Sequence, residues 1–215
     1  MNKIAIYGAG GFGLEVAYLI QKVNERFAIP EWEVIGFFDD GKKQGEINEY
    51  GPILGGINEL NAFHKPLYIA FGIRSHKIVK KIVSEINNEN IYFPNIISPD
   101  CKYLDRNSIT LGKGNILTSG CYFNYNIKVG DFNILDNNVS LGHDVIIGSN
   151  NSFMPGVRIS DYVVIGNSNL FGVYSVVLRQ KTIGNNTTIG AGSIIIRNTK
   201  DNYTYIGNPA IKFKF

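Results

Sequence analysis

Two hydrophobic patterns follow each other along the chain. In the first half, short apolar runs at 3–7, 33–38, 52–54, 67–71 and 91–93 alternate with helical patterns that end near residue 24 and span 75–85. Alternating strands and helices predict a small parallel α/β sheet. We therefore expect a Rossmann-like unit over residues 1–98.

The second half follows one repeat. Glycine recurs every 18 residues from Gly112 to Gly184, and asparagine does so from Asn115 to Asn169. Every sixth residue is apolar at Leu111, Leu117, Phe123, Val129, Leu135, Leu141, Ile147, Phe153, Ile159, Ile165, Phe171, Val177, Ile183, Ile189 and Ile195. Such a period predicts three short strands per coil of a parallel β-helix, here over residues 99–215, with the apolar ladder pointing inward. We expect the repeated glycines and asparagines at the turns, because both residue types tolerate left-handed backbone angles.

Composition narrows the function classes. The net charge is only +3 and no Lys/Arg stripe occurs, so nucleic-acid binding is not expected. No apolar run reaches the roughly 20 residues that span a bilayer, and no leader-like segment precedes the first strand, so membrane insertion is not expected. Two cysteines, Cys101 and Cys121, fit a reducing cytoplasm and offer no metal-binding spacing, so we expect no metal.

A glycine-rich turn joins the first strand to the first helix. Gly8, Gly10 and Gly13 fit G-x-G-x-x-G, whose backbone amides suit a diphosphate or another anion. Asp39 and Asp40 follow the second strand, where NAD enzymes place an acid for the ribose. A unit of about 95 residues is short for a dinucleotide fold, however, and no dehydrogenase-like substrate domain follows.

His143 is the one histidine embedded in the repeat. It comes two residues after the inward Leu141, so its side chain should leave the coil. Imidazole titrates near neutral pH and can take a proton from an attacking nucleophile. Asp144 would favour the imidazolium, provided that the chain turns there. The alternatives are a surface histidine at a subunit contact and a solvated corner aspartate.

These motifs together resemble a known family. The hexads resemble the bacterial hexapeptide acyltransferases, whose β-helix is left-handed. With the α/β half, the chain is similar to the sugar O-/N-acetyltransferases that include bacillosamine, perosamine and viosamine N-acetyltransferases and sialic acid O-acetyltransferase. The specific marks are GAGGFG at 8–13, FFDD at 37–40, GHDVIIG at 142–148 and IGNPA at 206–210.

The resemblance implies acetyl transfer from acetyl-CoA to the amino group of a nucleotide-linked amino sugar for surface glycan biosynthesis. The sugar would be a 4-amino-4,6-dideoxyhexose, and the amine would attack directly with His143 as general base. O-acetylation of a sugar hydroxyl, as in sialic acid, would use the same residues. A zinc carbonic anhydrase on this fold would need three histidines on the metal, and the repeat contains one, so this class is not expected. A non-catalytic sugar-nucleotide scaffold is also disfavoured, because it would not need His143 beside Asp144.

The resemblance also implies binding residues. The sugar nucleotide would lie against the α/β half, and acetyl-CoA along the coils at a junction of two subunits, near Ser152, Val173 and Ala191. The chain has Phe12 and Ile73 where members often have histidine and asparagine. Aromatic residues off the inward ladder, such as Tyr122, Phe132 and Tyr162, add to the expectation of a homotrimer. The positions implied for the sugar nucleotide are Gly8, Gly10, Gly11, Phe12, Gly13, Asp39, Asp40 and Gly72.

Overall fold

The computed structural model describes residues 1–213 and divides the chain into two compact units, Met1–Pro99 and a unit that begins at Asp100. The first unit contains β1 (Asn2–Tyr7), α1 (Gly11–Asn24), β2 (Trp32–Phe38), β3 (Ile47–Asn48), β4 (Gly51–Gly55), α2 (Ile57–Asn61), β5 (Leu67–Phe71), α3 (His76–Glu85), β6 (Ile91–Tyr92) and β7 (Ile96–Ile97). The α/β pattern predicted from the sequence is confirmed. The short β3 and α2 were not predicted.

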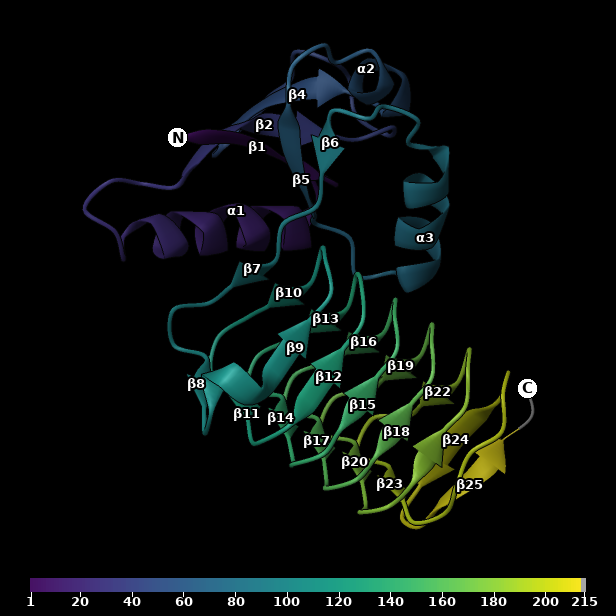
Figure 1. Cartoon of the computed structure of the whole chain (residues 1–215). Coiled ribbons are helices and arrows are strands. Elements are labelled where there is room, and N and C mark those ends of the chain that lie inside the picture. The colour runs from purple at the N-terminus through teal and green to yellow at the C-terminus, as the bar shows by residue number, and fades with distance from the viewer. Residues whose placement is uncertain (214–215) are drawn as a thin grey trace. The chain divides into compact units, whose positions relative to one another are not determined.

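The sheet of the first unit has the order β3-β4-β2-β1-β5-β6 (Figure 1). Its neighbours pair in parallel except for β3 and β4. β1 is central and buried from Ile4 to Tyr7, and α1 covers it with Val16 and Ile20. Along the strand order, β1 is followed in the chain by β2 on one side, and β5 is followed by β6 on the other side. The carboxyl ends of β1 and β5 therefore flank a topological switch point, where α/β sheets bind ligands.

The second unit is a parallel β-helix with three faces, which Figure 1 shows as rows of short stacked strands. Partners in successive coils are 18 residues apart, as in Ile116 with Ile134 and Leu117 with Leu135. The predicted left-handed β-helix fold is confirmed.

The strands fall into three rows. The first row contains β10 (Ile116–Leu117), β13 (Ile134–Leu135), β16 (Ser152–Phe153), β19 (Leu170–Phe171), β22 (Thr188–Ile189), β24 (Thr204–Gly207) and β25 (Ala210–Phe213). The second contains β8 (Lys102–Tyr103), β11 (Tyr122–Phe123), β14 (Ser140–Leu141), β17 (Arg158–Ile159), β20 (Val176–Val177) and β23 (Ile194–Ile195). The third contains β9 (Ile109–Leu111), β12 (Ile127–Val129), β15 (Ile146–Ile147), β18 (Val164–Ile165) and β21 (Thr182–Ile183), and a short 3₁₀ turn, Arg106–Ser108, precedes β9.

The inward apolar ladder is present as predicted. Every predicted position from Leu117 to Ile195 is buried, and Leu111 in the first coil is half-buried. A second inward ladder lies four residues further along and includes Val139, Val145 and Val157, each 0% exposed. Two ladders per face therefore fill the interior of the coil.

The repeated glycines and asparagines lie at the turns as expected, for example Gly130 and Asn133 between β12 and β13, but the expected left-handed angle at these residues is wrong. The left-handed residues of the corners are every sixth one, at Gly114, Gly120, Asn126, Phe132, Asn138, Asp144, Asn150, Gly156, Tyr162, Ser168, Tyr174, Gln180, Asn186 and Gly192. The repeated glycines are required by close packing. A Cβ at Gly166, for example, would lie 2.6 Å from Oδ1 of Asn185 in the next coil.

The repeated asparagines form a ladder inside the coil. Asn115, Asn133, Asn151 and Asn169 are each 0% exposed. The Asn151 side chain donates to Oδ1 of Asn133 and to the carbonyl of Gly166, and its Oδ1 accepts the amide of Asn169. The amide groups do bond up and down the stack at the turns, and their side chains are buried inside the coil.

Within residues 1–213, the structure contains no helix with both the length and the apolar character needed to cross a bilayer.

Candidate active site

His143 and Asp144 occupy one left-handed corner of the β-helix, between β14 and β15. Asp144 has φ of 56°, and this turn brings its carboxylate alongside the preceding imidazole. Nδ1 of His143 lies 2.8 Å from Oδ2 of Asp144. The condition on which the sequence prediction depended, a turn at Asp144, is therefore met. Both side chains remain about one-third exposed, so the imidazole is accessible.

Asp144 is held in place from two sides. His143 contacts one carboxylate oxygen, and the side-chain amide of Asn126 donates to the other at 2.5 Å. These hydrogen bonds, that with His143 foremost, lower the pKa of the Asp144 carboxyl. Asp144 is therefore ionised at neutral pH. Its carboxylate can orient the imidazole by accepting a hydrogen bond from Nδ1 of His143.

Asp161 is a second acidic partner of His143 that the sequence reasoning missed. Its Oδ2 lies 3.3 Å from Nε2 of His143, and its Oδ1 accepts the backbone amide of His143 at 3.2 Å. Asp161 stands 18 residues after His143, one full coil further along the chain. The repeat length alone could have placed it beside the histidine.

Tyr162 completes the surroundings of the imidazole. Its ring meets that of His143 edge to face, with centroids 4.8 Å apart. Beside this corner lies a cavity of about 300 Å³, lined by Asn126, Lys128, Asp144, Ile146, Tyr162 and Val164. Ile146 and Val164 are 46% and 41% exposed, so the third face of the coil is apolar next to the histidine.

The glycine-rich turn packs tightly at some positions and is open at others. Gly8 has φ of 104°, and a Cβ there would lie 2.6 Å from Cγ1 of Ile73. A Cβ at Gly13 would overlap the Gly8 carbonyl, and one at Gly72 would overlap Gly13. Gly10 and Gly11, in contrast, are exposed and have open space where a Cβ would be. The exposed backbone amides at the start of α1 can therefore be approached by an anion.

Asp39 and Asp40 tie the end of β2 to its neighbours. Asp39 accepts the backbone amides of Ala9 and Gly41 at 2.8 and 2.9 Å, which fixes the glycine-rich turn. Asp40 accepts the Tyr7 hydroxyl at 2.6 Å and the amide of Ile57 at 2.9 Å. Burial of the Tyr7 hydroxyl and its hydrogen bond to Asp40 raise the pKa of that tyrosine.

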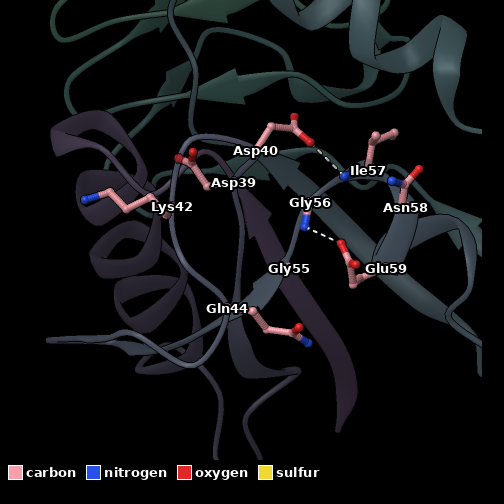
Figure 2. Close-up of a pocket in the computed structure, with 9 residues that line it drawn as sticks. All are labelled: Asp39, Asp40, Lys42, Gln44, Gly55, Gly56, Ile57, Asn58 and Glu59. Carbon is pink, nitrogen blue, oxygen red and sulfur yellow. Dashed lines mark hydrogen bonds between the residues drawn. The ribbon is translucent and has the colours of Figure 1, made fainter.

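A cavity of about 270 Å³ opens beside these two aspartates. Figure 2 shows its lining, with Asp40 reaching the amide of Ile57 and Glu59 reaching the amide of Gly56. Its walls are mostly polar, which suits a sugar or base with several hydrogen-bonding groups. The lining residues are Asp39, Asp40, Lys42, Gln44, Gly55, Gly56, Ile57, Asn58 and Glu59.

Phe12 is buried rather than open to a ligand. It is 7% exposed, and the guanidinium of Arg74 lies 4.1 Å from the centre of its ring. Arg74 also pairs with Glu15 at 3.0 Å. The role of Phe12 in substrate binding stays a prediction, and Arg74 is a cation near the glycine-rich turn that the sequence did not single out.

The three residues implied for acetyl-CoA lie away from His143 within one chain. Val173 and Ala191 stack in successive coils, with the Gly192 amide donating to the Val173 carbonyl at 2.8 Å. Ser152 begins β16, whose strand leads into the same edge of the coil, and its side chain is buried. The strand β15 separates Ser152 from the His143 corner. Their role in coenzyme binding stays a prediction.

Cys121 does not resemble a nucleophile. Cys121 is 0% exposed, and its hydrogen bond to Cys101 together with burial raises the pKa of its thiol. A thiol held protonated is a weak nucleophile. Over residues 1–213, no group of three or more His, Cys, Asp or Glu side chains is arranged to hold a metal ion.

Comparison with known proteins gives consistent matches. The family model of the PglD N-terminal domain matches residues 3–86. A search of curated protein sequences found no match.

Several solved structures match nearly the whole chain, among them the following three. The acetyltransferase domain of PglB from Neisseria gonorrhoeae, in complex with acetyl coenzyme A, has 26% identity and a TM-score of 0.87, covering 99% of this chain and 100% of that one. PerB from Caulobacter crescentus, in complex with CoA and GDP-perosamine, has 22% identity and a TM-score of 0.88, covering 100% and 98%. WeeI from Acinetobacter baumannii has 24% identity and a TM-score of 0.86, covering 99% and 100%.

The α/β unit with its glycine-rich turn, the β-helix with a histidine at one corner and these matches agree with the resemblance seen in the sequence. The chain is an acetyltransferase whose residues 3–86 match the PglD N-terminal domain family and whose whole length is similar to sugar acetyltransferases.

Proposed function

We propose that this protein transfers the acetyl group of acetyl-CoA to the amino group of a nucleotide-linked amino sugar, with a 4-amino-4,6-dideoxyhexose as the sugar. The observation that carries the proposal is the 2.8 Å contact between His143 Nδ1 and Asp144 Oδ2 at an exposed corner. Two matched structures support the substrates, because one holds acetyl coenzyme A and another holds CoA with GDP-perosamine.

The proposed chemistry is a direct transfer in a ternary complex. With Nδ1 donating to Asp144, the lone pair of Nε2 of His143 can accept one proton from the amino group that attacks. The amine nitrogen bonds to the thioester carbonyl carbon, and a backbone amide stabilises the oxyanion. The carbon–sulfur bond then breaks, and the leaving thiolate takes up a second proton from the nitrogen, which enters the site as an ammonium group. The buried, protonated Cys121 favours this route over an acetyl-cysteine intermediate.

We place the nucleotide at the carboxyl edge of the first unit's sheet. The open backbone at Gly10 and Gly11 would face the diphosphate, and the cavity beside Asp39 and Asp40 would receive the remainder of the nucleotide. GDP-, UDP- and dTDP-sugars should raise the melting temperature of the protein, because they bind the folded state. A shift with NAD and none with any sugar nucleotide would reject this assignment.

We further propose a homotrimer. The His143 corner and the Val173–Ala191 edge lie on different edges of one coil, so a second chain is needed to bring the base and the coenzyme together. The exposed apolar side chains Ile146 and Val164 offer a contact surface. Light scattering at micromolar concentration should give the trimer mass, and a monomer would contradict the proposal. The two proposed substrates fit the cytoplasmic location expected from the cysteines.

The test of function is a substrate panel read by free-thiol release. Wild-type protein and acetyl-CoA should turn over one of the GDP-, UDP- or dTDP-linked 4-amino-4,6-dideoxyhexoses. His143→Ala should lower kcat by roughly 10²–10⁴-fold, the usual contribution of one acid–base group, with little change in the KM for acetyl-CoA. His64→Ala and His76→Ala are matched controls and should stay within a few-fold of wild type. Turnover of hydroxy sugars alone would favour O-acetylation instead.

A further inference from the structure

We propose that Asp161 binds the amino group that is acetylated and so makes the site select amines over hydroxyls. The inference rests on the proposed function, with His143 as the base. It begins from one contact, the 3.3 Å between Oδ2 of Asp161 and Nε2 of His143. This places a carboxylate oxygen next to the nitrogen that must accept the substrate's proton.

Part of the role of Asp161 is structural and common in this coil. Its Oδ1 accepts the backbone amide of the residue one coil earlier. Asp131 does the same for Lys113 at 2.8 Å, and Asn167 does so for Ser149 at 2.7 Å. Either a carboxylate or an amide side chain can make this bond. The corner bond therefore does not explain why residue 161 is charged.

The second oxygen distinguishes Asp161. It points at the histidine. The cationic side chain one coil further on, Arg179, makes no ion pair among residues 1–213 and so leaves this oxygen available. The Asp161 side chain is 37% exposed, so a ligand can reach it. The histidine is thus flanked by two carboxylates, Asp144 at Nδ1 and Asp161 at Nε2, and an edge-on phenol, Tyr162.

This arrangement presents two acceptors side by side. When Nδ1 carries its proton toward Asp144, Nε2 has a lone pair and no hydrogen, and Oδ2 of Asp161 also lacks a hydrogen. A nucleophile with two or more N–H groups can donate to both atoms at once. A hydroxyl has a single hydrogen and leaves one of the two unsatisfied. An ammonium group gains in addition from the negative charge.

The reaction remains balanced with Asp161 in this role. The sugar amine enters as R–NH₃⁺ against Asp161, and Nε2 of His143 removes one proton to give R–NH₂. The nitrogen bonds to the acetyl carbon, the carbon–sulfur bond breaks, and a second proton goes from nitrogen to the leaving thiolate. The products are the amide and CoA thiol, and His143 returns its proton to solvent. Asp161 neither gains nor loses a proton in these steps.

The test compares two substitutions that preserve the coil. Asp161→Asn keeps an oxygen for the corner bond, as Asn167 does, but removes the charge beside Nε2. Asp131→Asn makes the same change at a corner without a histidine. Both variants should melt within a few degrees of wild type. The probes are GDP-perosamine and its UDP- and dTDP-linked 4-amino counterparts, each beside the same sugar with a 4-hydroxyl.

Asp161→Asn should lower kcat/KM for the accepted amino sugar by about 10- to 100-fold, the range for one hydrogen bond to a charged group. The KM for the amino sugar should rise, the KM for acetyl-CoA should not, and the preference for amine over hydroxyl should shrink. Asp131→Asn should match wild type. Asp161→Asn as active and as selective as Asp131→Asn would overturn the role of Asp161 and leave the proposed function standing. Wild-type turnover of hydroxy sugars alone would overturn both.

Discussion

Replacing Asn151 by alanine should destabilise the β-helix strongly although the Asn151 side chain makes no hydrogen bond to His143 or Asp144. The side chain is 0% exposed and makes three hydrogen bonds, to Asn133, Gly166 and Asn169. After the substitution Oδ1 of Asn133 keeps the backbone amide of residue 151 as a donor. The Gly166 carbonyl and the Asn169 amide lose the partner that Asn151 supplies.

The expected cost follows from these two groups. A buried polar group left unsatisfied costs about 1–3 kcal/mol, so two of them amount to roughly 2–5 kcal/mol when partial exposure of Gly166 is allowed for. In a chain of this length about 1 kcal/mol lowers the melting temperature by roughly 2–4 °C. Asn151→Ala should therefore melt on the order of 5–15 °C below wild type by circular dichroism, at matched protein concentration.

Asn167 supplies the control. It is exposed, and its side chain accepts the Ser149 amide and donates to Asn185. Water can replace these bonds in Asn167→Ala, so this variant should lose about 1 kcal/mol or less. Equal losses of stability in the two variants would refute the reasoning that the interior asparagine ladder, rather than corner bonding, secures the coils.

Three further predictions follow from other contacts. His143→Ala should raise the pKa of Asp144 towards its ordinary value, measured by NMR of the carboxyl carbon, and an unchanged pKa would contradict the contact. Because the pKa of Asp144 is lowered in the folded state, the stability that this carboxylate adds is present above about pH 4 and is lost as the pH falls through the folded pKa. Asp39→Ala should free the Ala9 amide and abolish the thermal shift given by sugar nucleotides, whereas an undiminished shift would separate Asp39 from binding. Gln180→Gly, at an exposed corner with φ of 59°, should raise the melting temperature slightly, since relief of about 1–2 kcal/mol exceeds the roughly 0.5–1 kcal/mol entropic cost of glycine, and a lower value would contradict it.

The interior of the coil could be predicted from the sequence because burial acts on every sixth side chain. Every sixth side chain from Leu117 to Ile195 is buried inside the coil, so the apolar period of six is strict. The short elements β3 and α2 left no such signal, because two and five residues do not establish a period. Gly72 could be tied to the glycine-rich turn by resemblance, and the structure adds its close contact with Gly13.

The corners and the site were harder to predict, for different reasons. Residue type is a weak guide to left-handed backbone here, since Phe132, Tyr162 and Gln180 adopt it while Asn133 and Asn151 do not. His143 stood out because the interior of the coil is lined with aliphatic side chains, and an imidazole does not serve that packing. Asp161 did not stand out, because aspartate and asparagine are common at corners and only the 18-residue spacing links it to the histidine.

The left-handed corners have a consequence for how such a protein could be re-engineered. They recur every six residues with side chains as different as those of Asp144, Tyr162 and Gln180, so the left-handed corner conformation does not require one residue type. Successive coils are about 4.8 Å apart, the spacing of neighbouring β-strands. A histidine–aspartate pair moved by 18 residues would thus shift the base by one fixed increment along the coil axis. The distance between the base and a bound acceptor could therefore be changed in discrete steps of one coil.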